Sequence, residues 1–405
     1  MKLGKKEASN MSSKTVVVGV CGGIAAYKAL DIISRLKKKD INVHVIMTKS
    51  AIEFVTPLSF QSLSQNMVIS DMFEEPRAWE IQHISLAKKA DLMLIVPATA
   101  NIIGKVANGI ADDMLSTTIM ATKAPVVFAP AMNTNMYKNP IVQDNIKKLK
   151  NFNYEFILPS SGRLACGDIG EGKLPDTEYI SEIVLSMIYD KKDLCGKEVL
   201  VTAGPTVSYI DPVRYITNRS SGKMGYAIAE EARDRGAKVT LISGPCSLKR
   251  PHGINLINVN TNEEMYNKVL EYYDKSDIVV KSAAVADYKP QNYSEKKIKK
   301  SEDDLKITFV RDYDILKTLG ERKKNQVLVG FAAESNDLIE NAQAKISKKN
   351  LDYIVANDIT LEDTGFSSDN NLVTILSSDG KVYNLDKMSK REIARELFDL
   401  LNKKR

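Results

Sequence analysis

The sequence predicts an α/β protein with two doubly wound domains, and three observations support this fold class. Short apolar, β-branched segments alternate with segments of helical periodicity, as in TVVVGV at residues 15–20 followed by a glycine turn and a helical pattern at residues 21–39. Several of these apolar segments run directly into loops rich in glycine, proline or threonine, and the whole pattern restarts near residue 196. Buried strands alternating with helices indicate a parallel sheet covered on both faces.

The expected strands can be followed along the chain. After residues 15–20, the first domain continues with INVHVIMT, DLMLIVPAT and PVVFAPAMN. The second domain contains GKEVLVTAGPT, AKVTLISGP, SDIVVKSAAVADY, QVLVGFAAE and LDYIVAND. Ligands of such sheets bind at the carboxyl ends of the strands, so we expect the sites in the loops that follow these segments.

The domain boundary is expected in the charged segment 189–198. We therefore divide the chain into a disordered leader at 1–14, a first domain at 15–190 and a second at 191–405. The leader is polar and basic and lacks the apolar core of a secretory signal, which makes the cytoplasm the default location.

Composition argues against several functional classes. The 405 residues carry a net charge of +6 and are 43% hydrophobic, without an apolar run long enough to span a membrane. The lysine clusters are spread along the chain instead of forming the single basic patch that nucleic-acid binding requires. Four scattered cysteines and three histidines do not show the spacing of a disulfide framework or a zinc site.

The first glycine loop, GVCGGIAAYK, favours a mononucleotide ligand. Backbone N–H groups at a helix start suit a phosphate, but the dinucleotide pattern G-x-G-x-x-G is missing. The second strand ends in VIMTKSA, without the acidic residue that would bind an NAD ribose. FMN therefore fits better than NAD, although Gly22 and Gly23 could also serve only to let the helix pack closely on the sheet.

A polar loop in the second domain, within GPTVSYIDPVRYITNRSSGKMG, enters another helix. Met224 stands where a P-loop would have its magnesium-binding hydroxyl, so the segment is not a P-loop. The side chains from Asn218 to Lys223 could bind an anionic ligand or could merely cap the helix.

Several of these strings, in this order, resemble the bifunctional phosphopantothenoylcysteine decarboxylase / phosphopantothenate–cysteine ligase family of coenzyme A biosynthesis. The strings in the first half are GVCGGIAAYK, QHISLAKKADLMLIVPATANIIGK, APAMNTNMY and SGRLACGDIGEGKL. Those in the second half are TAGPT, IDPVRYITNRSSGKMG, AAVADY, KIKK and GFAAE. The resemblance implies a flavodoxin-like flavoprotein domain, which decarboxylates 4′-phosphopantothenoylcysteine to 4′-phosphopantetheine, and a Rossmann-like ligase domain. The ligase would join cysteine to 4′-phosphopantothenate through an acyl-cytidylate, with CTP as co-substrate.

The decarboxylase reaction needs an electron sink, because loss of CO2 from a cysteine carboxylate otherwise leaves an unstabilised carbanion. Oxidised FMN can withdraw two electrons from the thiol-bearing carbon and return them after CO2 has left. By resemblance, Cys166 in its glycine-rich loop donates the final proton, His83 promotes the oxidation or positions the carboxylate, and Asn133 binds the carboxylate or amide. We expect the flavin to contact Gly22, Gly23, Ile24, Thr48, Pro97, Ala98, Thr99 and Asn101.

The expected ligase residues also follow from the resemblance. Asn218 matches the residue that handles the acyl-cytidylate, and Lys297 in KIKK matches the lysine that steadies the phosphates. Asp287 is expected to contact the nucleotide or Mg2+, whose protein ligands the sequence does not identify. The other expected nucleotide contacts are Phe331, Lys345 and Lys349. On composition alone, such lysines are ordinary solvated surface residues.

Alternative interpretations remain at this point. Taken alone, His83 could be a helix cap and Asn133 a turn residue, and Tyr137 and Lys173 stand where the family usually has Trp and Arg. Proteins that share the flavin half include peptide-cysteine decarboxylases and regulatory subunits that bind phosphatases. A two-domain NAD oxidoreductase is disfavoured by both glycine loops. The family also implies trimeric flavin domains, with sites at subunit interfaces, and dimeric ligase domains, while the choice of CTP over ATP stays open.

Overall fold

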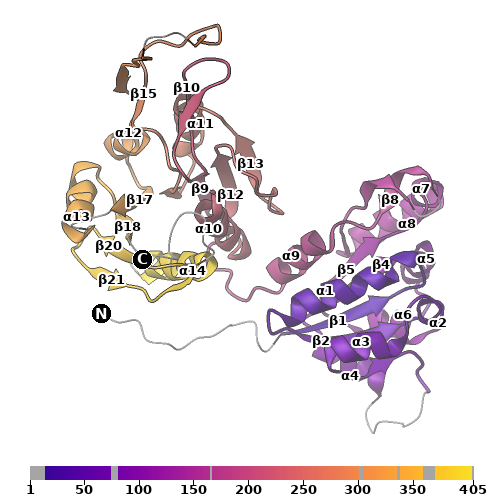
Figure 1. The fold of residues 1–405 in the computed structure, drawn as a ribbon. Coiled ribbons are helices and arrows are strands. Elements are labelled where there is room, and N and C mark those ends of the chain that lie inside the picture. Colours follow the sequence, from indigo (N-terminus) through magenta and orange to yellow (C-terminus); the bar gives the residue numbers. More distant parts are fainter. Residues whose placement is uncertain are drawn as a thin grey trace. The chain divides into compact units, whose positions relative to one another are not determined.

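In a computed structural model of the chain, the described residues are 14–73, 81–164, 167–300, 304–334, 338–358 and 370–403 (Figure 1). They form two compact units that divide between Asp190 and Lys191. Each unit contains a parallel sheet with helices on its faces, which confirms the predicted fold class. Most of the leader, residues 1–13, lies outside the described residues.

The first unit is built on a six-stranded parallel sheet in the order β3-β2-β1-β4-β5-β6. The strands are β1 (Thr15–Val20), β2 (Asn42–Met47), β3 (Val68–Ile69), β4 (Leu92–Ala98), β5 (Val126–Pro130) and β6 (Glu155–Phe156). Without the two-residue β3, the order is that of flavodoxin-like sheets, as expected. With β3, it becomes the six-stranded order of dinucleotide-binding sheets.

Helices surround this sheet on both faces. They are α1 (Lys28–Lys37), α2 (Lys49–Ile52), α3 (Pro57–Ser64), α4 (Gln82–Lys89), α5 (Ala100–Ala107), α6 (Met114–Ala121), α7 (Thr134–Lys138), α8 (Pro140–Asn151) and α9 (Thr177–Met187), with a 3₁₀ turn at Ile24–Tyr27. Two separate buried clusters flank the sheet, one including α1 and α9 and the other including α5 and α8. This double coverage explains why β1 and β4 are apolar along their whole length.

A hairpin follows this sheet in sequence. It comprises β7 (Ser160–Arg163) and β8 (Ile169–Lys173), which pair antiparallel in a sheet of their own. Its turn includes the segment with Cys166, and residues 165 and 166 lie outside the described residues.

The second unit has an eight-stranded sheet in the order β13-β12-β9-β14-β17-β18-β20-β21. The strands are β9 (Glu198–Ala203), β12 (Lys238–Ser243), β13 (Asn255–Asn258), β14 (Ile278–Lys281), β17 (Val327–Glu334), β18 (Tyr353–Asp358), β20 (Val373–Ser377) and β21 (Val382–Asn384). The first six are parallel and have the Rossmann order. β20 pairs antiparallel with β18, and β21 pairs antiparallel with β20. These two strands and β13 are not among the strands that the sequence predicts.

In the described part of the second unit, five helices accompany the sheet, and three short antiparallel pairs form separate small sheets. The helices are α10 (Lys223–Asp234), α11 (Asn262–Tyr273), α12 (Ile315–Arg322), α13 (Leu338–Lys348) and α14 (Lys390–Lys403). The paired strands are β10 (Val207–Tyr209) with β11 (Tyr215–Thr217), β15 (Tyr288–Pro290) with β16 (Phe309–Arg311), and β19 (Asn370–Asn371) with β22 (Met388–Ser389). Sequence periodicity does not reveal these pairs, because strands of two or three residues are too short to show it.

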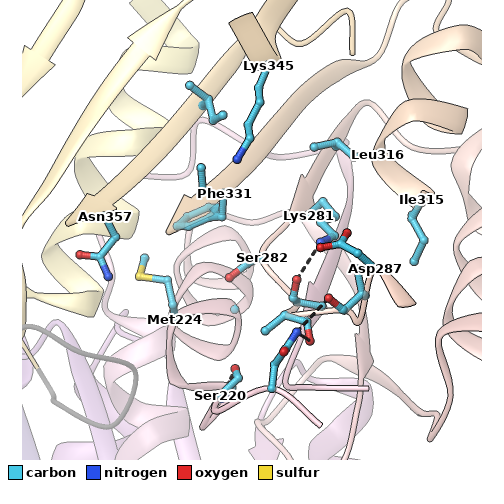
Figure 2. Close-up of a pocket in the computed structure, with 18 of the residues that line it drawn as sticks. Ser220, Met224, Lys281, Ser282, Asp287, Ile315, Leu316, Phe331, Lys345 and Asn357 are labelled. Atoms are coloured by element: carbon cyan, nitrogen blue, oxygen red, sulfur yellow. Dashed lines mark hydrogen bonds between the residues drawn. The ribbon is translucent and has the colours of Figure 1, made fainter. Parts of the chain in front are cut away.

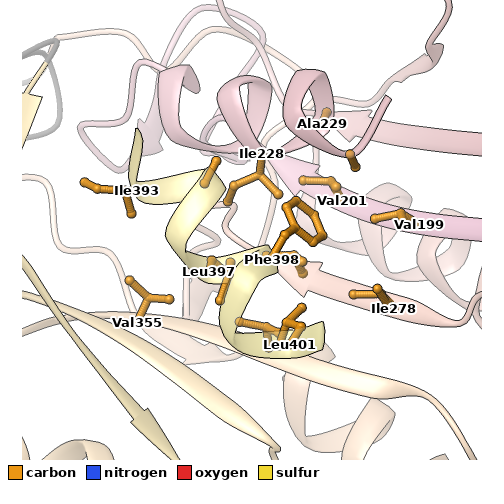
Figure 3. Packing of buried hydrophobic residues seen from close by; sticks show 14 of the residues in the cluster. Val199, Val201, Ile228, Ala229, Ile278, Val355, Ile393, Leu397, Phe398 and Leu401 are labelled. Atoms are coloured by element: carbon orange, nitrogen blue, oxygen red, sulfur yellow. The ribbon is translucent and has the colours of Figure 1, made fainter. Parts of the chain in front are cut away.

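Helix α14 closes the core of the second unit against α10. Figure 3 shows Leu397 and Phe398 of α14 packed towards Ile228 of α10 and Val201 of the sheet, and all four side chains are fully buried. The Arg235 guanidinium, at the end of α10, is inaccessible to solvent and pairs with Glu231 at 2.8 Å and Asp399 at 2.5 Å. The pair with Asp399 joins the end of α10 to α14, which is far away in sequence.

Candidate active sites

The expected flavin-binding residues of the first unit lie after three adjacent strands. Gly22 and Gly23 follow β1, Thr48 follows β2, and Thr99 follows β4. Parallel pairing places the carboxyl ends of these strands at one edge. Thr48 and Thr99 cap the following helices by accepting hydrogen bonds from Ala51 N and Ile102 N.

The space around the backbone differs between the residues of the glycine loop. A Cβ at Gly22 would lie 2.4 Å from Ser50 Cβ, so this glycine is required for close packing. A Cβ at Gly23 would meet no atom within 4 Å, and the Ile24 side chain is 60% exposed. Pro97 and Ala98 are buried in β4, whereas Asn101 is exposed. The edge thus offers backbone groups and open space, and these residues fit a bound flavin phosphate.

Asn133 connects the end of β5 to the hairpin that carries the Cys166 turn. Its Oδ1 accepts a hydrogen bond from Asn135 N at 2.8 Å, and its Nδ2 donates to Asp168 Oδ2 at 3.1 Å. Leu164 N donates to the Asp168 carbonyl at 2.8 Å, which closes the turn around residues 165–167. Asn133 and Asp168 therefore hold this turn at the carboxyl end of β5.

Close backbone packing fixes the same hairpin. Met132 N donates to Gly172 O at 3.0 Å, and a Cβ on Gly172 would lie 2.2 Å from Met132 O. Gly172 also has a φ of +127°, which a residue with a side chain rarely adopts. The glycine-rich segment around Cys166 thus includes one glycine, Gly172, that is required for close packing.

His83 and Cys166 complete the expected set in the first unit. His83 is half-buried in the first turn of α4, and its side chain does not cap this helix, whose N-cap is Ile81. Cys166 lies outside the described residues.

The second unit contains a cavity of about 370 Å³ at the carboxyl ends of β14, β17 and β18. Of the expected residues, Asn218, Asp287, Phe331, Lys345 and Lys349 all line it. Figure 2 shows Phe331 near the centre of the view, Asp287 on one side and Asn357 on the other. The cavity thus brings together residues from distant parts of the sequence.

Asn218 is held against the loop that follows β14. Its Nδ2 donates to Ala284 O at 3.2 Å and to Val285 O at 2.9 Å. The polar loop then enters α10 through Gly222, whose φ of +78° favours glycine. Ser220, Ser221 and Lys223 line the cavity beside this helix start, as expected of an anion-binding segment.

The cavity is rich in positive charge. Besides Lys223, Lys345 and Lys349, it is lined by Lys281 at the end of β14 and Lys390 at the start of α14. Lys349 pairs with Asp314 at 2.9 Å. Burial raises the pKa of Asp314, but hydrogen bonds from Lys317 N and Lys349 outweigh it and hold this pKa below its usual value.

Lys281 and Lys390 are cavity residues that the sequence interpretation missed. Lys281 ends an apolar strand in which periodicity gives no reason to single out one lysine. Lys390 is only 6% exposed, but it precedes an amphipathic helix and has the sequence appearance of a surface residue. The position of Lys281 at a strand end was the one available signal.

Lys297 is the expected ligase residue that the structure does not bring into the cavity. It is exposed in the segment between β15 and β16. The next residue, Ile298, donates its N–H to Asp211 Oδ2 at 3.1 Å and accepts from Arg214 Nη1 at 3.1 Å. Burial raises the pKa of Asp211, but hydrogen bonds from Val213, Ile298 and Arg214 lower it to about 2. The Asp211 carboxylate thus anchors the segment that carries Lys297.

Two searches of the described residues returned nothing. In these ranges, no group of three or more His, Cys, Asp or Glu side chains is arranged to hold a metal ion. Nor does any helix there combine the length and apolarity needed to cross a bilayer.

Comparisons with known proteins agree with the division of the chain into two units near residue 190. The family model "Flavoprotein" matches residues 5–189, and "DNA/pantothenate metabolism flavoprotein C-terminal domain" matches residues 194–404. A relative from Bacillus subtilis, "Coenzyme A biosynthesis bifunctional protein CoaBC", is 49% identical over 96% of each chain. A protein of the same name from Borreliella burgdorferi is 44% identical over 96% of this chain and 99% of its own.

A solved structure of the C-terminal domain of a coenzyme A biosynthesis bifunctional protein CoaBC is 43% identical. The match covers 52% of this chain and 96% of that one, with a TM-score of 0.46. The regulatory alternative considered above assumed that the chain resembles its relatives in the flavin half alone. The matches to bifunctional relatives cover 96% of this chain, so the resemblance extends over both halves and does not favour that alternative. The chain therefore belongs to the family of bifunctional coenzyme A biosynthesis enzymes, with a decarboxylase and a ligase on one polypeptide that act on small-molecule substrates.

Proposed function

We propose that the first unit binds FMN and decarboxylates 4′-phosphopantothenoylcysteine, and that the second makes this compound from 4′-phosphopantothenate, cysteine and CTP. The observation that carries the proposal is the placement of the expected residues at strand ends in both units. In the second unit, all the expected residues except Lys297 line one cavity. In the first, the expected flavin-binding residues lie at or directly after the ends of β1, β2 and β4, and Asn133 follows β5.

In the first unit, we assign flavin binding to the loops after β1, β2 and β4, namely Gly22, Gly23, Ile24, Thr48, Pro97, Ala98, Thr99 and Asn101. Bound FMN would supply the acceptor for two electrons from the thiol-bearing carbon. Asn133 would bind the substrate carboxylate or amide, and His83 would orient the substrate thiol or carboxylate. Cys166 would deliver a proton to the product carbon from the turn that Asn133 and Asp168 hold.

In the second unit, we assign the acyl-cytidylate to Asn218 and the nucleotide to Asp287, Phe331, Lys345 and Lys349. The cavity's excess of lysines over carboxylates suits a triphosphate. Lys297 would reach the phosphates only after its segment moves, because it does not line the cavity in this structure. Such closure over a bound substrate is common in enzymes of this kind.

Mg2+ fits this site as a companion of the nucleotide. With Asp287 and Asp314 as the carboxylates that line the cavity, a magnesium ion would take most of its oxygen ligands from phosphates and water. CTP is proposed over ATP by family membership, since no base-reading contact is established.

We further propose a cytoplasmic homo-oligomer, with flavin sites that lie between subunits. Large apolar side chains near the flavin edge are exposed, including Ile24 at 60% and Ile169 at 84%. Exposed apolar surface of this kind is typical of protein interfaces.

The test uses the purified full-length chain. We expect the absorption spectrum of bound flavin, pyrophosphate release with CTP, phosphopantothenate and cysteine, and then release of CO2. Replacing CTP by ATP tests the nucleotide assignment. A folded protein without affinity for FMN would contradict the assignment of the first unit. Pyrophosphate release with ATP but not with CTP would contradict the choice of nucleotide for the second.

A further inference from the structure

The Lys281 side chain occupies a distinctive place in the cavity of the second unit. It is the last residue of β14, is only partly buried, and lines the cavity that contains the expected ligase residues. Its Nζ donates a hydrogen bond to Ala283 O at 2.9 Å. Figure 2 shows it on the same side of the cavity as Asp287.

This ammonium group lacks a balancing negative charge. Among the described residues, no carboxylate forms an ion pair with Lys281, and its acceptor is a neutral carbonyl. Lys349, by contrast, is paired with Asp314. The charged groups that face Lys281 are Asp287, Asp314, Lys345 and Lys349. A partly buried ammonium that forms no ion pair with a carboxylate is poorly compensated, and a bound anion would stabilise it.

The protonation equilibrium of Lys281 reflects the same setting. Desolvation lowers its pKa to about 8, and the nearby positive charge of Lys349 acts in the same direction. Asp287 and Asp314 only partly oppose these effects. A phosphate that approaches the ammonium would raise the pKa again, so that the protein takes up a proton on binding.

Lys281 and Asn218 are attached to successive carbonyls of one short loop. Lys281 bonds to the carbonyl of Ala283, and Asn218 bonds to those of Ala284 and Val285. These two polar groups come from segments far apart in sequence, and the loop holds both at the cavity wall. Both side chains line the cavity beside this loop, so one ligand that occupies the cavity can contact both.

We propose that Lys281 is a further catalytic residue of the ligase half, and that its ammonium binds the α-phosphoryl group of the nucleotide. This inference rests on the proposed function, in which Asn218 handles the acyl-nucleotide. In the first step, a carboxylate oxygen bonds to the α-phosphorus, and the bond to pyrophosphate breaks with its electron pair. In the second step, the cysteine nitrogen bonds to the acyl carbon, the bond to the nucleotide phosphate breaks, and the amine loses a proton to solvent. The α-phosphoryl oxygens carry negative charge throughout, so one ammonium can stabilise both steps.

The kinetic test compares Lys281→Met with Lys348→Met, whose lysine is exposed at the end of α13 and does not line the cavity. We expect Lys281→Met to lower kcat for pyrophosphate release, without cysteine present, by about 10²-fold. Release of CO2 from added phosphopantothenoylcysteine should not change. Because methionine removes a desolvated charge, the ligand-free variant should unfold at a temperature no lower than that of the unaltered protein. A kcat within threefold of the Lys348→Met value would overturn the proposal.

A binding measurement gives an independent readout. Inorganic tripolyphosphate is titrated into each full-length protein at about pH 8, in two buffers of different ionisation enthalpy. We expect greater proton uptake by the unaltered protein than by Lys281→Met, because only the unaltered protein can protonate Lys281 when the phosphate binds. Protonation changes of the ligand itself are the same in both titrations and cancel in the comparison. Equal uptake would count against an ammonium–phosphate contact. If the unaltered protein releases no pyrophosphate from CTP, the proposed function fails, but a Lys281-dependent proton uptake would still support the contact.

Discussion

The two units place their expected sites at the same end of a parallel sheet, but the sites differ in how far a single unit encloses them. In the second unit, residues from α10, β14, β17 and α13 surround one cavity. In the first, the loops that we expect to bind flavin form an open edge, with Ile24 exposed and a hairpin packed beside Asn133. The residues of an enclosed site can be identified because they line the same cavity. An open site needs a further element, either a mobile segment or a neighbouring one, to cover the bound ligand.

The largest expected effect concerns the enclosed site. We expect Asn218→Asp to lower CTP-dependent formation of phosphopantothenoylcysteine by about 10²- to 10³-fold, because a carboxylate would repel the acyl phosphate. Decarboxylation of added phosphopantothenoylcysteine should be unchanged. The matched control is Asn267→Asp, an exposed position in α11. Equal ligase rates in the two variants, measured by pyrophosphate release, would show that Asn218 does not contact the reacting group.

The second prediction tests whether the hairpin completes the open site. Asp168→Ala removes the acceptor of the Asn133 Nδ2 hydrogen bond but leaves the backbone bond from Leu164 to residue 168. We expect about a tenfold fall in kcat for CO2 release and product formation, because a misplaced proton donor loses efficiency. The flavin spectrum and ligase rate should not change.

Two further variants sharpen this test of Asp168. Asp168→Asn keeps an acceptor oxygen and should restore most of the activity, whereas Asp144→Ala, at an exposed position in α8, should have no effect. A loss of activity that Asp168→Asn fails to restore would point to a role for the charge instead of the hydrogen bond.

The third prediction concerns the packing of the same hairpin. Gly172→Ala would bring a Cβ within 2.2 Å of Met132 O at a φ of +127°, so we expect the first unit to lose about 1–3 kcal/mol of stability. Gly167→Ala is the matched control, since its φ is +93° but its Cβ would meet no atom within 4 Å. Urea unfolding followed by flavin fluorescence measures both. A Gly172→Ala loss no greater than that of Gly167→Ala would mean that the close contact is easily relieved.

The smallest expected effect concerns Asp211, which anchors the Lys297 segment in the second unit. Its folded-state pKa of about 2 lies below the unfolded value, so its contribution to stability is complete above about pH 4 and is lost as the pH falls towards 2. Asp211→Asn should therefore lower the thermal unfolding temperature near pH 7 and lose its effect near pH 2. A difference that stays constant over this range would exclude a contribution from the carboxylate charge.

The sequence predicts the central strands well because coverage on both faces makes them largely apolar, as in β1 and β4. The resemblance assigns Asn218, Asp287 and Phe331 to the ligase site, and the structure places all three at one cavity. The antiparallel strands β20 and β21 are not predicted, because strands of three to five residues show too little periodicity to be identified from the sequence.

Individual side chains are harder to predict than strands. Lys390 becomes a cavity residue only because α14 returns to pack on α10, a contact that no local pattern encodes. Lys297 shows the reverse case, since its motif suggests phosphate binding while its segment lies outside the cavity in this structure. Asp168 is visible in the sequence as one polar residue among glycines, and its contact with Asn133 depends on tertiary packing.

The packing of α14 against α10 also affects the order in which the elements of the second unit fold. The core joins Ile228 to Leu397, so a long stretch of chain must be brought together before both sides are shielded from water. Contacts of such large sequence separation form slowly, because the loop between them must first be closed at an entropic cost. We expect a folding intermediate in which the strands from β9 to β18 are paired while α14 is still undocked, its exposed groove being a natural place for chaperones to bind.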